Sequence, residues 1–90
     1  MMRTLILYSK GGCHLCEGLK EKLGHVQGLE FTLQVRDIES DQAWFDAYQY
    51  EVPVLMQLFE DGQEKLIPRP SPRITVERLE RHLQRHVTVT

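Results

Sequence analysis

Residues 8–16 read Tyr8-Ser9-Lys10-Gly11-Gly12-Cys13-His14-Leu15-Cys16, and they contain both cysteines of the 90-residue chain. An apolar run from Thr4 to Tyr8 leads into Ser-Lys-Gly-Gly, which is typical of a buried strand followed by a tight turn. If a helix begins after this turn, the sulfurs of Cys13 and Cys16 lie on one face of its first turn. The helix dipole and the free N–H groups there stabilise a thiolate. The spacing therefore predicts a strand, a turn and a helix that carries a redox site.

The helix and a second strand are visible in the hydrophobic periodicity. Apolar residues recur at three- and four-residue steps from Cys13 to Leu23, which predicts an amphipathic helix that ends near Gly24 or Gly28. Its predicted apolar face consists of Leu15, Cys16, Leu19 and Leu23. Apolar and polar residues then alternate over residues 31–37, with Phe31, Leu33 and Val35 on one face, which predicts a strand.

A short second helix is expected after this strand. Ser40 is predicted to cap it, with Asp41 in its first turn, and it is expected to end at about Tyr48. The residues expected to point inward are Ala43, Trp44, Ala47 and Tyr48.

The remaining residues predict a hairpin and a last helix. Residues 54–59 and 65–67 read as two strands joined by the turn sequence Glu60-Asp61-Gly62-Gln63. Pro68, Pro70 and Pro72 end the second of these strands. Thr75 is predicted to cap a helix that ends near His86 and places Val76, Leu79 and Leu83 inward.

The predicted element order is β-α-β-α-β-β-α within one domain over residues 1–90. Strands joined through a helix are expected to run parallel, and the hairpin adds an antiparallel strand. The expected structure is an α/β domain with a four-stranded mixed sheet flanked by three helices, which is the core of the thioredoxin fold.

Composition excludes several classes of partner. The 11 basic and 13 acidic residues are interspersed and give a net charge of −2, so no nucleic-acid partner is expected. No apolar run approaches the roughly 18 residues of a membrane span, and residues 1–3 show no signal-peptide pattern. We therefore expect a cytoplasmic protein without membrane contact. Structural disulfides are rare in that compartment, so the cysteine pair is expected to be catalytic, redox-sensing or metal-binding.

The chain resembles the glutaredoxins, and more closely the small bacterial glutaredoxin-like proteins of the thioredoxin superfamily. The segment 8–16 resembles the family's strand end and active site, and Val52-Pro53 resembles its Val-Pro before the third strand. The resemblance covers nearly the whole chain. It implies a cis peptide bond at Pro53, with Val52 pairing through its backbone with an extended substrate.

The chemistry expected of such a site is thiol–disulfide exchange. Cys13 is expected to attack a substrate disulfide as a thiolate, and Cys16 to resolve the mixed disulfide, which leaves a Cys13–Cys16 disulfide. The expected substrate is a disulfide-containing protein or a small thiol compound, acted on by a monomer. No bound cofactor is expected, and glutathione is a possible reductant.

Several neighbouring residues have two interpretations each. Protonated His14 either stabilises the Cys13 thiolate or is a solvated imidazole, and Lys10 either supplies charge to the site or is a solvent-exposed lysine. Tyr8 and Tyr50 are expected either to line the substrate groove or to belong to the core.

Two departures from the family pattern concern glutathione. Glu51 stands where glutaredoxins usually have threonine, and the segment 68–72 stands where they have two glycines and an acidic residue. In the family these elements hold glutathione, so we expect weak glutathione binding here.

Two other functions remain open. A metal or shared iron–sulfur site could use the two thiols with a histidine, although His14, His25, His82 and His86 are scattered over separate elements. A non-catalytic redox sensor or binding module would need the same reactive thiol as an enzyme.

Overall fold

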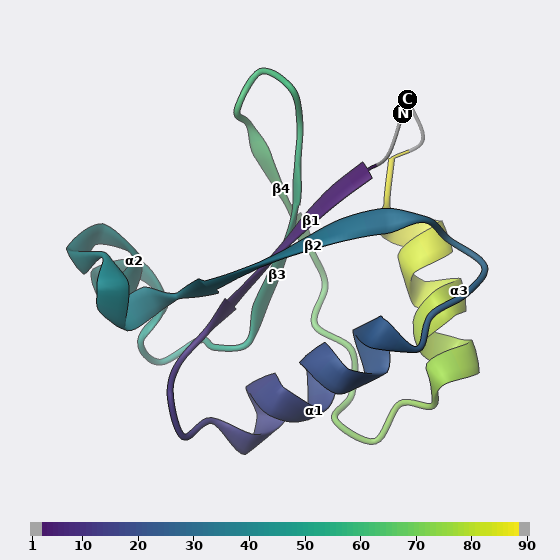
Figure 1. The fold of residues 1–90 in the computed structure, drawn as a ribbon, viewed down its shortest axis with the longest axis horizontal. Helices are drawn as coiled ribbons and strands as arrows, with labels where there is room; N and C mark the ends of the chain where they lie inside the picture. The colour runs from purple at the N-terminus through teal and green to yellow at the C-terminus, as the bar shows by residue number, and fades with distance from the viewer. Residues whose placement is uncertain (1–2, 89–90) are drawn as a thin grey trace.

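The computed structural model of the protein describes residues 3–88 (Figure 1). Its elements are β1 (Arg3–Ser9), α1 (His14–Gly24), β2 (Phe31–Asp37), the 3-10 helix η1 (Ile38–Ser40), α2 (Gln42–Tyr48), β3 (Val54–Leu58), β4 (Glu64–Ile67) and α3 (Val76–His86). The predicted order, and the α/β class with a mixed sheet and three α-helices over these residues, are confirmed. Residues 1–2 and 89–90 lie outside the described residues. The expectation that no signal-peptide pattern is present rests partly on the first two.

The strand directions differ in one respect from the expectation. In the sheet order β2-β1-β3-β4, β1 and β2 are parallel, whereas β3 is antiparallel to β1 and β4 is antiparallel to β3. The expected parallel relationship between β2 and β3 is therefore wrong. Helix α2 lies beyond the carboxyl ends of β1 and β2 (Figure 1), and β3 starts at that same edge, with Val54 opposite Tyr8. After α2 the chain therefore enters β3 at the edge where β2 ends, and it does not cross the sheet to the opposite edge first.

Helices α1 and α3 cover one face of the sheet. Leu5 and Leu7 of β1 point to this face, where the burial of apolar side chains supplies most of the stabilisation. The buried residues of this core are Leu5, Leu7, Leu19, Leu23, Leu55, Ile67, Leu79, Leu83 and Val87. Leu15, predicted to belong to it, is 48% exposed and is a correction to the expected apolar face of α1.

The second face packs against α2. Ile6, Tyr8, Ile38 and Val54 are buried there under half-buried aromatic residues of α2. The predicted cap of this helix is wrong, and of its predicted inward residues Trp44 and Tyr48 are confirmed and the two alanines are wrong. The cap is Asp41, whose Oδ1 accepts from the N–H groups of residues 43 and 44, because Ser40 ends η1. The inward residues are Trp44, Phe45 and Tyr48, whereas both predicted alanines are exposed.

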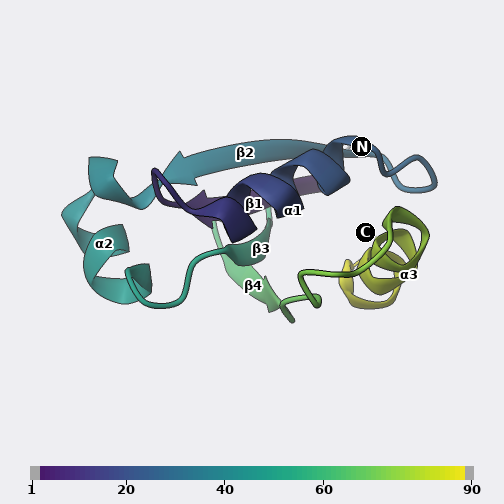
Figure 2. The ribbon, with the colours of Figure 1, turned by 90° about the horizontal axis from the view of Figure 1, so that it is seen from below.

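Helix α3 begins as predicted. The hydroxyl of Thr75 accepts a hydrogen bond from the N–H of Arg78 over 3.2 Å, and Leu79 and Leu83 are buried. Figure 2 shows α2 and α3 at opposite ends of the molecule, with α1 between them. Within residues 3–88, no helix is both long enough and apolar enough to cross a membrane.

Candidate active site at the start of helix α1

A tight turn places Cys13 at the start of α1. The N–H of Cys13 donates to the carbonyl of Lys10 over 3.2 Å, and Gly12 has a φ of 79°, in the left-handed region that glycine tolerates best. Cys13 itself has extended backbone angles and is the N-cap residue of α1. The turn sequence therefore decides where the helix begins, and the helix begins at a cysteine.

The two cysteines form a disulfide across the first turn of α1. Their Cα atoms are 5.3 Å apart, and the backbone N–H of Cys16 donates to Cys13 Sγ over 3.2 Å. Cys16 is only 2% exposed, whereas Cys13 is half-buried. An incoming sulfur therefore reaches Cys13 more easily than Cys16.

The Val52-Pro53 peptide bond is cis, as the resemblance implies. Val52 is half-buried and packs against the cluster on the α2 side of the sheet, and Pro53 is buried. Pro53 lines the same pocket as His14 and Leu15, so the proline and the cysteine turn border one space.

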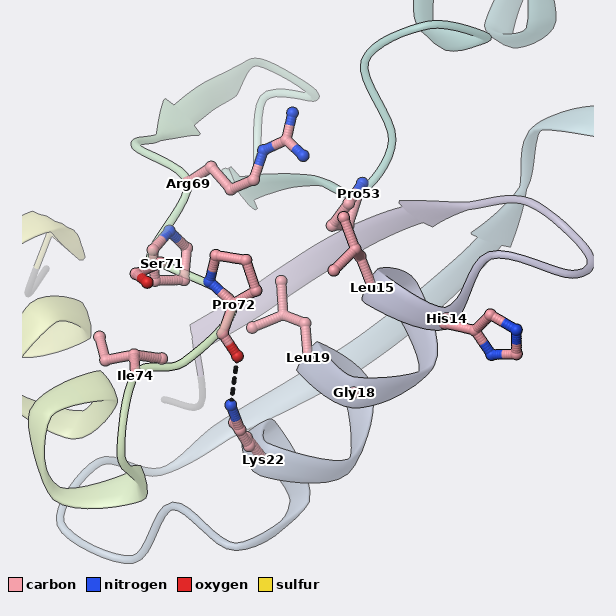
Figure 3. A pocket seen from close by; sticks show the side chains of 11 residues that line it. His14, Leu15, Gly18, Leu19, Lys22, Pro53, Arg69, Ser71, Pro72 and Ile74 are labelled. Carbon is pink, nitrogen blue, oxygen red and sulfur yellow. Dashed lines mark hydrogen bonds between the residues drawn. The ribbon is translucent and has the colours of Figure 1, made fainter.

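This pocket, which we call the active-site groove, has a volume of about 330 Å³. It lies between the outer face of α1 and the segment that follows β4 (Figure 3). Its lining residues are His14, Leu15, Gly18, Leu19, Lys22, Pro53, Arg69, Pro70, Ser71, Pro72 and Ile74. The groove is mostly apolar, and none of the described residues that line it is acidic.

The wall opposite α1 is the proline segment, Pro68–Pro72. Lys22 Nζ on α1 donates to the carbonyl of Pro72 over 2.8 Å, and an Arg69 guanidinium N–H donates to the carbonyl of Glu51 over 3.1 Å. On α3, the His82 Nε2–H donates to the carbonyl of Pro68 over 2.6 Å. Three side-chain donors therefore fix the segment that stands where glutaredoxins have glycines.

The charged residues expected to act at the site differ in their contacts and in their exposure to solvent. The His14 side chain is 96% exposed, with Nδ1 3.9 Å from a carboxylate oxygen of Glu17, and Figure 3 shows it pointing away from the groove. Lys10 Nζ lies 5.8 Å from the centroid of the Phe45 ring, and Lys10 lines a separate small pocket that also reaches Cys16. Glu51 is exposed beside Val52 and meets Arg69 through its backbone.

Tyr8 is a core residue and does not line the groove. It is 1% exposed, and its hydroxyl donates to Glu64 over 2.6 Å and accepts from Arg36 over 2.9 Å. Burial, with the hydrogen bond and charge of Glu64, raises the pKa of Tyr8 to about 12, although Arg36 opposes the rise. The interpretation of Tyr8 as a groove residue is therefore wrong. Tyr50 is 89% exposed.

The histidines do not form a metal-binding cluster with the thiols among the described residues. Within residues 3–88, no three His, Cys, Asp or Glu side chains lie close enough together to hold a metal ion. His82 and His86 have ring centroids 4.7 Å apart on α3, and burial, with the electrostatic effect of His82, Arg85 and Lys65, lowers the pKa of His86. His82 already binds the proline segment.

Sequence reasoning missed three residues of the groove: Leu15, Lys22 and Arg69. Leu15 has the helical spacing of a core residue, and Lys22 lies in the last turn of α1, where a basic residue is common. The sequence could have indicated Arg69 as a site residue, because an arginine between two prolines directly after a strand is held close to the edge of the sheet.

Comparison with known proteins identifies the family. Residues 4–84 match the family described as glutaredoxin-like domain (DUF836). The X-ray structure of the structural genomics target XcR50 from X. campestris is similar, with 30% identity over 90% of this chain and 96% of that one and a TM-score of 0.60. No curated protein sequence matches significantly.

More distant structures show the fold alone. Thioredoxin 1 from Thermosipho africanus covers 93% of both chains with 13% identity and a TM-score of 0.60. A malarial protein covers 98% of this chain and all of its own, with 12% identity and a TM-score of 0.64. With the family match over most of its length and this thioredoxin fold, the chain belongs to the glutaredoxin-like domain family.

Proposed function

We propose that the protein is a thiol–disulfide oxidoreductase in which Cys13 attacks and Cys16 resolves. The observation that carries the proposal is the Cys13–Cys16 disulfide at the start of α1, with Cys16 buried and Cys13 half-buried. The cis Val52-Pro53 bond beside the same groove and the glutaredoxin-like family support it.

The reaction starts from the reduced dithiol. The Cys13 thiolate attacks one sulfur of a substrate disulfide, the substrate S–S bond breaks, and its other sulfur leaves as a thiolate that takes up a proton from water. Cys16 then loses its proton and attacks Cys13 Sγ, which releases the second substrate sulfur as a thiol. Two electrons have moved from the protein to the substrate, and the Cys13–Cys16 disulfide remains.

The backbone prepares Cys13 for the first step. In the oxidised chain its sulfur accepts a hydrogen bond from the N–H of Cys16 at the positive end of the helix dipole. Both favour a negative charge on sulfur, so Cys13 is the thiol that ionises first. Lys10 adds positive charge at longer range.

A thiol from outside must restore the dithiol. Two molecules of glutathione would do so by forming one glutathione disulfide, and the cytoplasm is the compartment that supplies them. We take the acting form to be a monomer without a bound cofactor.

Turnover tests the proposal. The purified protein, with excess dithiothreitol as reductant, should reduce insulin disulfides over many cycles, and Cys13→Ser should abolish turnover. The Cys16→Ser variant should accumulate the mixed disulfide with substrate, visible by mass spectrometry. A single stoichiometric reaction without recycling would identify the protein as a redox sensor instead.

A further inference from the structure

We propose that the active-site groove selects polypeptide disulfides that carry an apolar side chain and a carboxylate close to the reacting cysteine. This inference rests on the proposed function and names its substrate class. It depends on four features of the groove: an exposed leucine, two cations with no acidic residue among the other described lining residues, a fixed opposite wall and a length suited to a peptide.

Leu15 supplies the apolar contact. It lies between the two cysteines in the sequence, is 48% exposed, and lines the groove together with Pro53 (Figure 3). The other apolar residues of α1, Leu19 and Leu23, are buried in the core. A large apolar residue left half in water beside a reactive sulfur gains stability when an apolar group of a substrate covers it. Ile74 offers a second, half-buried apolar contact.

Lys22 and Arg69 supply the charge. Both line the groove, and each uses a hydrogen bond to a backbone carbonyl that holds its charged group in place. A lysine has three N–H donors and an arginine has five, so each retains donors for a carboxylate. The chain as a whole carries more acidic than basic residues, yet no acidic side chain is among the described residues that line this groove.

The groove is held open. Lys22 on α1 and His82 on α3 donate hydrogen bonds to the proline segment, and Arg69 within the segment donates one to Glu51. The segment therefore forms a fixed wall. Across from it, Gly18 lies inside α1, where alanine would be more favourable for a helix and a Cβ atom would meet nothing within 4 Å. Packing does not explain a glycine there, whereas a substrate backbone that approaches the helix closely does.

The length of the groove suits a short extended peptide, and glutathione, a tripeptide, differs from the proposed substrate in its side chains. Its α1 side runs from His14 to Lys22, about 12 Å at 1.5 Å per helical residue. An extended chain rises about 3.3 Å per residue, so three to four substrate residues fit. Glutathione has carboxylates for the two cations, but it has no apolar side chain to cover Leu15.

The test compares mixed disulfides of thionitrobenzoate with four thiols: peptides that carry Leu and Asp, Leu and Lys, or Ser and Asp beside the cysteine, and glutathione. The release of thionitrobenzoate by the pre-reduced protein in a single turnover gives the second-order rate constant, which corresponds to kcat/KM. The Leu-Asp peptide should exceed each of the other three by about three- to tenfold, since a partly exposed charge pair or a small apolar contact is worth a factor of this order.

Variants separate the two contacts. Arg69→Gln and Lys22→Gln should each reduce the preference for Asp over Lys by about two- to fivefold. Lys20→Gln is the matched control, because Lys20 is exposed on the same helix and lines a different pocket. Leu15→Ser should reduce the preference for Leu over Ser and retain the preference for Asp.

A second measurement needs no variant. Raising the salt concentration should lower kcat/KM for the Asp peptide and raise it for the Lys peptide, because salt screens both interactions. Equal rates for all four thiols, or glutathione as the best substrate, would overturn the selectivity and leave the oxidoreductase intact. No repeated reduction of insulin and no thionitrobenzoate release from any of the four would instead overturn the proposed function.

Discussion

The backbone N–H of Cys16 points at Cys13 Sγ and donates a hydrogen bond to it over 3.2 Å. Cys13 thus caps helix α1 through its sulfur, and the N–H that it caps belongs to its disulfide partner. This donor belongs to the backbone, so it persists whatever side chain occupies position 16. The contact links the start of helix α1 to the reactivity of its first sulfur.

The reduced protein should therefore titrate at Cys13 with a pKa below the ordinary cysteine value of about 8.5. Thiolate absorbance in the ultraviolet, followed against pH, measures it. The Cys16→Ser variant keeps the backbone donor and leaves one thiol, so the curve can be assigned to Cys13. A pKa at or above the ordinary value would contradict an activated nucleophile.

His14→Ala should leave that titration unchanged. The imidazole is 96% exposed, faces Glu17 and points away from the groove, so solvent screens its charge from the thiolate (Figure 3). The control is Glu17→Gln, which removes the neighbouring carboxylate from the same exposed turn. An upward move of the Cys13 titration in His14→Ala would show that the imidazole acts on the sulfur.

Much of the fold could be predicted because hydrophobic periodicity is local. The alternation in β2 and the spacing in α1 and α3 each follow from a few neighbouring residues. The direction of β3 could not be predicted, because it depends on where α2 lies relative to the sheet. The cap of α2 was misassigned because Ser40 and Asp41 are both good capping residues and η1 takes the first of them.

The residues of the candidate site also divide into those that the sequence predicts and those that only the fold brings together. Cys13, Cys16 and Pro53 have sequence signatures, whereas Lys22 and Arg69 line one groove only when the segment after β4 folds against α1. Tyr8 was ambiguous, because it follows an apolar strand and precedes the active-site turn. Its hydrogen bond to Glu64 across the sheet shows that Tyr8 belongs to the core.

Tyr8→Phe should flatten the stability profile at alkaline pH. The pKa of Tyr8 is about 12 in the folded chain and about 10 when unfolded, so the folded state holds the proton more tightly. This contribution is complete below about pH 10 and is lost as pH rises toward 12. Urea unfolding of both proteins at a series of pH values measures it. An identical alkaline loss in the variant would contradict the assignment.

Gln57→Leu should lower the free energy of unfolding by about 1–3 kcal/mol, since it leaves two backbone groups of Thr88 without partners. The Gln57 side chain is 3% exposed; its amide donates to the carbonyl of Thr88 over 3.0 Å and accepts from the N–H over 2.7 Å. It therefore fixes the chain after α3 to the sheet. Urea unfolding measures the loss, and Gln27→Leu, at an exposed position, should change stability by less than about 0.5 kcal/mol. Equal effects would contradict this role.

Gly28→Ala should destabilise the protein, because its Cβ would collide with the carboxylate of Glu80. Glu80 accepts hydrogen bonds from the N–H groups of Gln27 and Gly28, over 3.3 and 2.7 Å, and so ties α3 to the loop after α1. The carboxylate is the end of a flexible side chain and can move aside, but both exposed hydrogen bonds are then broken, at a cost of about 0.5–1.5 kcal/mol in thermal or urea unfolding. Gly18→Ala is the matched control: a Cβ there meets nothing within 4 Å, so helix propensity should make it more stable by about 0.5–1 kcal/mol. Shifts of the same sign in both variants would contradict the close approach at Gly28.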